Sequence, residues 1–217
     1  MKVLVIAGAS GKSGHAVART FADNGWKVIA LGSNADRLET VQADERTMVD
    51  LRDASATAEV AKGIVERWGR VDGVVHLVGA WSPGHGEATL TKLLGANLVT
   101  LRNSCLAFWD ALVASGNGRL AMVSSPVVDR PVWREANYAI SKAAAETWMR
   151  SFSRSWGREG TAAAVILRVK FLGEKMGGTP VSDLAIACSN LWDTSVAAIN
   201  GTTIDLADLG QPSVTSP

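Results

Sequence analysis

The sequence has few cysteines and no excess of charge, and each absence excludes a class of protein. Cys105 and Cys188 are the two cysteines of the 217-residue chain. They lie far apart without metal-ligand spacing, so we expect reduced core residues, no disulfide scaffold and no metal site. Twenty-two basic and twenty-one acidic side chains give a formal charge of +1. The chain therefore lacks the positive electrostatic field that would attract nucleic acid or an anionic membrane. A small-molecule partner is more consistent with this charge balance.

Long apolar runs are also absent. No run approaches the roughly 18 residues of a membrane span, and the apolar segment 2–7 is too short for a signal peptide. We therefore expect a cytoplasmic protein. Hydrophobic residues make up 47% and charged residues 20% of the chain, which is a globular composition. The length fits one domain, which we place at 1–210, followed by a frayed, uncharged tail at 211–217.

A short apolar strand that runs into a glycine turn opens the chain. Val3–Ala7 is continuously apolar, as expected of a central parallel strand covered on both faces. A helix is predicted at about 12–22, and the glycine-rich segment that leads into its first turn contains Gly8, Gly11 and Gly14. Backbone N–H groups at such a helix N-terminus can receive a pyrophosphate. The opening therefore predicts a dinucleotide-binding unit.

Apolar runs and helical patterns alternate along the rest of the chain. We expect further strands at 26–31, 47–51, 71–78, 118–124, 162–169 and within 200–210. Helices are expected at 54–68, from 90 onward, at 137–156 and at 181–192. Strands that alternate with helices build βαβ units. The predicted fold class is α/β: a Rossmann-type, doubly wound parallel sheet of about seven strands with helices on both faces.

Three side chains that can move a proton together lie in the stretch 125–142. Tyr138 and Lys142 are four residues apart on a predicted helix, so they share one face. A cation beside the phenol would lower its pKa from about 10 towards neutral, which suits a general acid or base. Ser125 follows a predicted strand, at the edge where ligands gather in open α/β sheets. A Tyr-x-x-x-Lys pair also occurs by chance in helices, but Tyr138 is the only tyrosine of this chain.

The glycine turn and the spacing of Ser125, Tyr138 and Lys142 together resemble the short-chain dehydrogenase/reductase family over nearly the whole chain. The resemblance implies an oxidoreductase that transfers a hydride between a nicotinamide cofactor and a small carbonyl or alcohol substrate. It implies four catalytic residues: Ser125 holds the carbonyl, Tyr138 donates the proton, and Lys142 binds the nicotinamide ribose. The fourth, Asn97, would hold a water that links the lysine to solvent.

The resemblance also implies where the cofactor binds. Family members that prefer NAD place an acidic side chain after the second strand, whereas this chain has Ser33 and Asn34, followed by Arg37. Nothing anionic there repels a 2′-phosphate, so we expect NADP(H) rather than NAD(H), although Arg37 also fits a solvated helix charge. The expected cofactor-binding residues are Gly8, Ser10, Gly11, Lys12, Ser13, Gly14, Ser33, Asn34, Arg37, Asp50, Leu51, Gly79, Ala80, Tyr138 and Lys142.

Several positions depart from the family pattern. The glycine spacing is G-x-x-G-x-x-G rather than G-x-x-x-G-x-G, with Lys12 in place of the middle glycine. The family's N-N-A-G reads H-L-V-G, and we expect its His76 to be structural. The usual Pro-Gly after the sixth strand is missing, and Gly173 stands where a threonine holds the nicotinamide carboxamide. Arg168 and Lys170 in this segment are candidates for contact with cofactor phosphate or an acidic substrate.

These departures leave alternatives open. One is a non-catalytic NADP-binding sensor or scaffold. Another is a pteridine-type reductase, because segments 79–81 and 162–176 resemble the dihydropteridine reductases of the same family, which act on a planar quinonoid pterin. Trp81 and His85 lie in a loop that would contact such a substrate. The resemblance also implies a homodimer or homotetramer formed by the helical segments 90–113 and 137–156, and the short segment 174–180 predicts a site that is open or completed by a neighbouring subunit.

Overall fold

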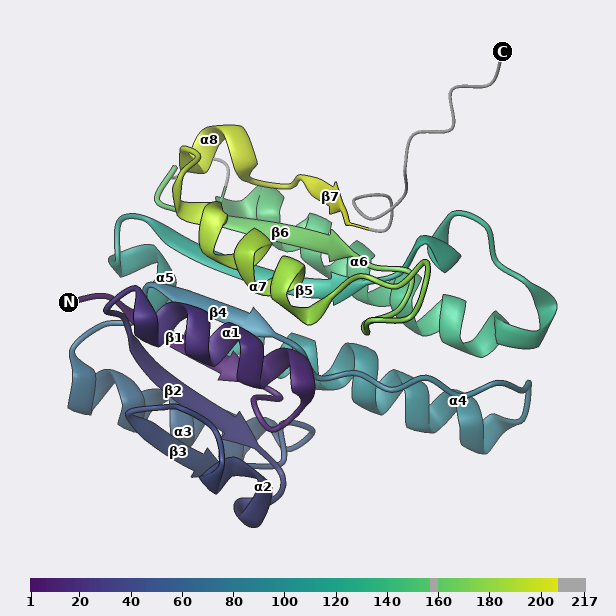
Figure 1. Ribbon diagram of the computed structural model, residues 1–217, viewed down its shortest axis with the longest axis horizontal. Coiled ribbons are helices and arrows are strands. Elements are labelled where there is room, and N and C mark those ends of the chain that lie inside the picture. Colours follow the sequence, from purple (N-terminus) through teal and green to yellow (C-terminus); the bar gives the residue numbers. More distant parts are fainter. Residues whose placement is uncertain (157–159, 207–217) are drawn as a thin grey trace.

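Seven parallel strands form the centre of the computed structural model, which describes residues 1–156 and 160–206 (Figure 1). The strands pair in the order β3-β2-β1-β4-β5-β6-β7. Their bounds are β1 Val3–Ala7, β2 Lys27–Gly32, β3 Glu45–Met48, β4 Gly73–His76, β5 Gly118–Ser124, β6 Ala162–Arg168 and β7 Thr203–Asp205. The strand order reverses at β1 and β4, and open α/β sheets bind their ligands in the crevice at such a point.

Helices cover both faces of the sheet (Figure 1). Their bounds are α1 Lys12–Asp23, α2 Ala35–Glu39, α3 Ala54–Trp68, α4 Glu87–Leu94, α5 Thr100–Ala114, α6 Ala136–Trp156, α7 Val181–Ser189 and α8 Val196–Ile199. A π-helical turn at Gly95–Val99 joins α4 to α5, and 3₁₀ turns occur at Pro126–Val128, Trp133–Glu135 and Asn190–Trp192. α1 and α7 pack together on one face, and α3, α5 and α6 lie on the other.

The alternation of β1 shows how the apolar sequence builds two cores. Val3 and Val5 belong to the cluster that packs against α3, α5 and α6. Leu4 and Ile6 belong to the cluster that packs against α1 and α7. Successive strand residues point to opposite faces, so a strand that is apolar at every position must be covered on both. The predicted doubly wound α/β fold is therefore confirmed, and the described residues form a single domain.

Element boundaries differ from the prediction mainly where the chain turns. β3 ends at Met48 rather than at 51, and β4 covers 73–76 rather than 71–78. The predicted last helix at 181–192 ends at Ser189, and α8 follows it, started by Ser195, whose hydroxyl accepts a hydrogen bond from the Ala198 N–H. The expected tail at 211–217, and the end of the expected closing segment from residue 207, lie outside the described residues.

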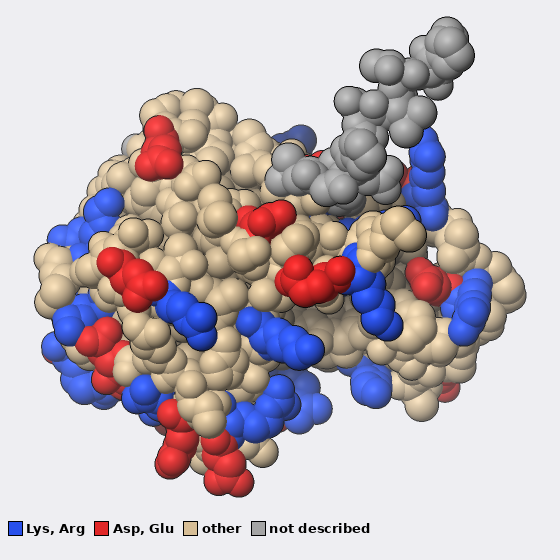
Figure 2. Space-filling view, in the orientation of Figure 1, with Lys and Arg blue, Asp and Glu red and all other residues tan. Residues whose placement is uncertain are grey.

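The remaining whole-chain predictions concern cysteines, charge and membranes. Cys105 and Cys188 are free and buried, as expected, and burial raises the pKa of each thiol to about 12. Basic and acidic side chains are interspersed on the face that Figure 2 shows, in line with the formal charge of +1. In the parts of the chain that the structure describes, no helix combines the length and apolar character needed to span a bilayer.

Candidate active site

The glycine turn after β1 is shaped by close packing at two of its three glycines. Gly8 has φ +82°, and a Cβ there would lie 2.9 Å from the Val78 N atom. A Cβ on Gly14 would lie 2.2 Å from the Ala9 carbonyl oxygen. A Cβ on Gly11, in contrast, would make only an ordinary contact, 3.7 Å from the Gly8 carbonyl oxygen, so packing leaves room for a side chain there. α1 begins directly after it and has no acidic residue in its first turn, so the turn fits a pyrophosphate group.

A cleft of about 1080 Å³ lies beside this turn. The predicted cofactor-binding residues that line it are Gly8, Ser10, Gly11, Ser33, Arg37, Asp50, Leu51 and Gly79. Two other predicted residues have structural contacts instead. Gly14 packs α1 against the turn, and the Asn34 side chain accepts a hydrogen bond from the Arg37 N–H and so caps α2. Lys12 is exposed and does not line the cleft.

Two arginines border this cleft. Arg37 donates from Nη2 to the Ser10 carbonyl oxygen at 3.1 Å, which lays its guanidinium along the glycine turn. Arg52 donates from Nε and Nη2 to Asp50, at 2.9 Å to Oδ1 and 2.6 Å to Oδ2, and these hydrogen bonds lower the pKa of Asp50. The sequence did not indicate Arg52, because the family motif marks Asp50 and says nothing of the residue that pairs with it.

A second cleft, of about 470 Å³, adjoins the first at Gly79. Among the predicted residues, Ser13, Gly79, Ala80, Ser125, Tyr138 and Lys142 line it, together with Trp81, Glu135, Lys170 and Phe171. Ser125 comes from the end of β5, and Tyr138 and Lys142 come from successive turns of α6. The structure thus brings three of the four predicted catalytic side chains into one cleft, at the carboxyl edge of the sheet.

The electrostatics of Tyr138 differ from the expectation. Burial raises the pKa of Tyr138, the nearby Ser125 hydroxyl lowers it, and the charge of Glu135 raises it. The Lys142 Nζ lies 6.0 Å from the Tyr138 ring centroid and donates to the Val123 carbonyl oxygen at 2.9 Å. Burial also lowers the pKa of Lys142 to about 8, while Glu146 raises it. The predicted fall of the Tyr138 pKa is therefore wrong for this structure, because desolvation outweighs the effect of the Ser125 hydroxyl.

Asn97 is the fourth predicted catalytic residue, and it lies buried in the π-helical turn. Its Oδ1 accepts from the Ala80 N–H at 2.8 Å. Its Nδ2 donates to the Ala80 carbonyl oxygen at 3.0 Å and to the Ser141 Oγ at 2.8 Å. Asn97 therefore ties the loop after β4 to α6, next to Lys142. Ser141, which the sequence did not single out, completes this link.

His76 lies in the core, as expected for a structural histidine. Its Nε2 lies 3.2 Å from the Thr100 Oγ1. Burial, with a smaller effect of the Lys142 charge, lowers the pKa of His76 to about 3. The ring is therefore neutral at physiological pH, which agrees with a supporting position at the end of β4.

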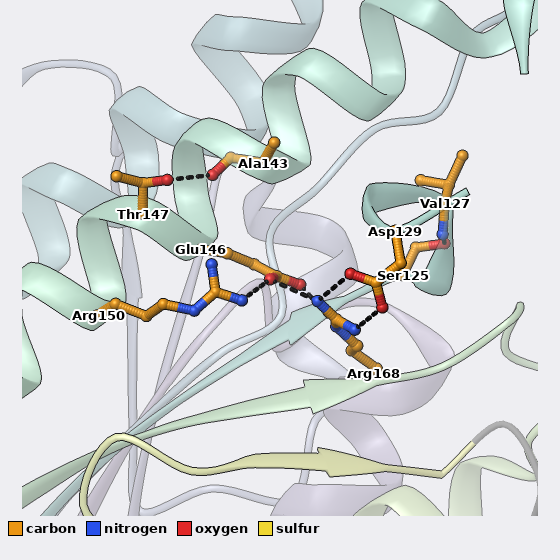
Figure 3. A network of polar contacts seen from close by, with 8 residues as sticks. All are labelled: Ser125, Val127, Asp129, Ala143, Glu146, Thr147, Arg150 and Arg168. Atoms are coloured by element: carbon orange, nitrogen blue, oxygen red, sulfur yellow. Dashed lines mark hydrogen bonds and ion pairs between the residues drawn. The ribbon is translucent and has the colours of Figure 1, made fainter. Parts of the chain in front are cut away.

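Two candidate ligand contacts, one at the end of β6 and one in the loop after β4, are corrected by the structure. Arg168 does not line either cleft, and Glu146 and Asp129 bind its guanidinium on two sides (Figure 3). Lys170, in contrast, lines the second cleft. His85 stacks on Trp133 with ring centroids 4.1 Å apart, so its ring contacts a neighbouring loop. Trp81 is 53% exposed and lines the second cleft, as expected for a residue that contacts substrate.

Comparisons with known proteins agree with this arrangement. The chain is 29% identical to the 2,3-dihydro-2,3-dihydroxybenzoate dehydrogenase of Bacillus subtilis over 160 residues, which are 66% of this chain and 60% of that protein. It is 24% identical to the NADP-dependent 3-hydroxy acid dehydrogenase of Salmonella typhi over 145 residues, which are 64% of this chain and 52% of that protein. The chain thus spans little more than half the length of these relatives.

The fold resembles that of solved structures. A variant of actinorhodin polyketide ketoreductase, crystallised with NADPH, superposes with a TM-score of 0.86 at 18% identity, over 97% of this chain and 98% of that one. The short chain dehydrogenase family model matches residues 2–169. The chain therefore belongs to the short-chain dehydrogenase family, whose members are oxidoreductases that use a nicotinamide cofactor.

Proposed function

We propose that this protein is an NADP(H)-dependent reductase of a small carbonyl substrate, which in reverse oxidises the corresponding alcohol. The observation that carries the proposal is the position of Ser125, Tyr138 and Lys142 in one cleft. This cleft adjoins, at Gly79, the cleft of the glycine turn. A nucleotide held at the turn can therefore reach the serine, tyrosine and lysine through a shared wall.

The side chains fit proton transfer to a carbonyl oxygen. Ser125 and Tyr138 offer hydroxyl groups that can both donate hydrogen bonds to that oxygen. Because burial raises the pKa of Tyr138, its hydroxyl is protonated at neutral pH and is ready to act as the acid in the reductive direction. A bound reduced nicotinamide supplies the hydride to the carbonyl carbon. The Tyr138 proton goes to the oxygen, and the Lys142 cation stabilises the phenolate that remains.

The preference for NADP(H) is supported by the charge beside the glycine turn. Arg37 and Ser33 line the first cleft where an NAD-preferring site has a carboxylate. We expect Arg37→Ala to weaken NADPH binding by about tenfold or more and to leave NADH binding nearly unchanged, because the guanidinium would pair with the 2′-phosphate. Equal losses for both cofactors would show that Arg37 does not recognise this phosphate.

The proposal is tested by two measurements made in sequence. NADPH and NADH are titrated into the protein, with energy transfer from the tryptophans as the signal. NADPH oxidation is then followed with aldehydes, ketones and a quinonoid pterin. We expect tighter binding of NADPH and turnover of at least one carbonyl compound. Turnover confined to the pterin would support the pteridine-type reductase, and NADPH binding without turnover across the panel would support the non-catalytic sensor instead.

We also propose that the protein acts in the cytoplasm as a homodimer or homotetramer assembled through α5 and α6. In support, Leu106 on α5 is 48% exposed and Ile140 on α6 is 52% exposed, and apolar side chains of this size suit a subunit interface. Light scattering of the purified protein gives the assembly directly. A monomer at micromolar concentration would contradict the proposal.

A further inference from the structure

A buried arginine joins the two elements that contribute the proposed catalytic groups (Figure 3). Arg168 is the last residue of β6 and pairs in register with Ser124, the residue before Ser125. Its guanidinium donates from Nε to the Glu146 Oε1 at 2.9 Å and from Nη2 to the Glu146 Oε2 at 2.8 Å. On its other side it donates from Nη1 and Nη2 to the two carboxylate oxygens of Asp129. One planar group thus binds two carboxylates at once.

The two carboxylates belong to different elements of the second cleft. Glu146 lies on α6, one turn after Lys142 and two turns after Tyr138. Asp129 ends the turn that begins at Ser125, and this turn is closed by a hydrogen bond from the Val128 N–H to the Ser125 carbonyl oxygen at 3.2 Å. The Ser125 Oγ also accepts from the Val127 N–H at 3.3 Å. The position of Asp129 therefore fixes the turn that carries Ser125.

The charges are arranged so that the cluster stays ionised. Burial by itself raises the pKa of Glu146, but hydrogen bonds from Arg168 and the nearby Ser124 hydroxyl, together with the charges of Arg168 and Arg150, hold its pKa below the usual value. Arg150 donates a further hydrogen bond to Glu146 at 2.5 Å. The two arginines balance the two carboxylates. A buried ion pair of this kind adds little net stability, because the cost of desolvation offsets the attraction, so stability alone is a weak reason for it.

We propose that Arg168 is a positioning residue, which clamps the Ser125 turn to α6 and so sets the Ser125 hydroxyl against the Tyr138 hydroxyl. The inference rests on the proposed reductase function. Ser125 lies near enough to Tyr138 to lower its pKa, so a shift of the turn that carries Ser125 would change the pKa of the proposed proton donor. Misplacement of such groups by about 1 Å can cost about a hundredfold in rate.

The test uses a double variant, Glu146→Met with Arg168→Met, which replaces the buried pair by apolar side chains and is expected to keep the fold. Asp129, with 60% of its side chain exposed, is then free to be hydrated. We expect kcat to fall about a hundredfold while the Kd for NADPH stays within about twofold of the wild-type value. Unchanged kcat in a folded double variant would overturn the proposal.

A spectroscopic measurement separates the clamp from the proposed reaction. Tyr138 is the only tyrosine, so tyrosine isotope-labelled at Cζ gives a single NMR signal that reports the hydrogen bond with Ser125. We expect this signal to move in the double variant in the same direction as in Ser125→Ala. The signal shows whether Arg168 positions the Ser125 turn even if the wild-type protein binds NADPH and reduces none of the carbonyl compounds. An unmoved signal would overturn the clamp and leave the proposed function standing.

Two further variants complete the design. Arg70→Met is the matched control, because Arg70 also binds a buried carboxylate, that of Asp72, with two hydrogen bonds, but Asp72 lies at the opposite, amino end of the strands. It is expected to leave kcat and the tyrosine signal unchanged. If the double variant does not fold, Asp129→Asn releases the turn alone. It should lower kcat about tenfold without a change in Tm, and an unaltered kcat there would overturn the proposal.

Discussion

Lys142 is the residue at which stability and the proposed chemistry conflict. Its side chain is buried, its ammonium group donates to the Val123 carbonyl oxygen, and burial lowers its pKa to about 8. In the unfolded chain a lysine has a pKa of about 10.4. Below the folded pKa, the folded protein therefore carries a charge that burial disfavours. Between about pH 8 and pH 10.4 the unfolded state binds more protons than the folded state, so this cost disappears as the pH rises.

We therefore predict that Lys142→Met is more stable than the wild-type protein at neutral pH. The expected gain in the free energy of unfolding is about 1–3 kcal/mol at about pH 7, and it should shrink as the pH rises above about 8. Denaturant unfolding at several pH values measures it. Lys62→Met, at an exposed position of α3 with 78% of its side chain accessible, is the control and should change stability by less than about 0.5 kcal/mol. A Lys142→Met protein less stable than wild type at neutral pH would contradict the prediction.

At this scale the sequence predicted which residues meet but not how their environment acts on them. The four-residue spacing of Tyr138 and Lys142 and the place of Ser125 after a strand were enough to expect one cleft. The direction of the Tyr138 pKa depends on burial in the folded protein, and the local sequence pattern around Tyr138 does not contain that burial. Arg168 was expected to contact a cofactor or substrate for the same reason. Its partner Glu146 is 22 residues earlier in the chain, so the local sequence does not reveal the ion pair.

At the scale of elements, two glycines of the turn after β1 have different roles. Gly14 is needed for the packing of α1, whereas Gly11 is proposed to leave space for the pyrophosphate. Gly14→Ala would bring a methyl group within 2.2 Å of the Ala9 carbonyl oxygen, so α1 would have to move away from the turn. We expect it to lower the free energy of unfolding by about 1–3 kcal/mol or more, the cost of overpacking at a core position. Thermal or denaturant unfolding measures the loss.

Gly11→Ala is the matched variant on the same turn. Its φ of −85° suits any residue, the added methyl group would make only an ordinary contact with the Gly8 carbonyl oxygen, and Gly11 lines the first cleft. We expect a change in stability below about 1 kcal/mol but weaker NADPH binding, because the methyl group enters the space where the pyrophosphate is proposed to lie. Equal losses of stability in the two variants, or unchanged NADPH affinity in Gly11→Ala, would show that the turn is not used as proposed.

Element prediction succeeded where the pattern is long and local. α3 and β5 have the predicted bounds, since α3 starts at the Asp53 cap and ends at Gly69 in a left-handed conformation, and β5 is built around the apolar run 120–123. Among the shorter elements, α8 was not predicted, and β7 lies within the broader predicted range 200–210. α8 has four residues and β7 has three, and such lengths depend on docking against β6 more than on their own sequence.

For the whole molecule, cofactor binding should be visible as stability. A ligand that binds the folded state alone raises the free energy of unfolding by about 2.7 kcal/mol at one hundred times its Kd. We predict that NADPH raises the Tm in a concentration-dependent manner, and that NADH at equal concentration raises it less. Thermal unfolding followed by tryptophan fluorescence gives both values. A larger shift with NADH would contradict the proposed NADP(H) preference.

The proton-donor role of Tyr138 is tested most directly by kcat of Tyr138→Phe, measured with NADPH and a carbonyl substrate that the wild-type protein reduces. The substitution removes the hydroxyl and keeps the ring. We predict that the Kd for NADPH stays within about twofold and that kcat falls by about 10²–10⁴. A Tyr138→Phe protein that binds NADPH and retains near-wild-type turnover would contradict the proposed mechanism.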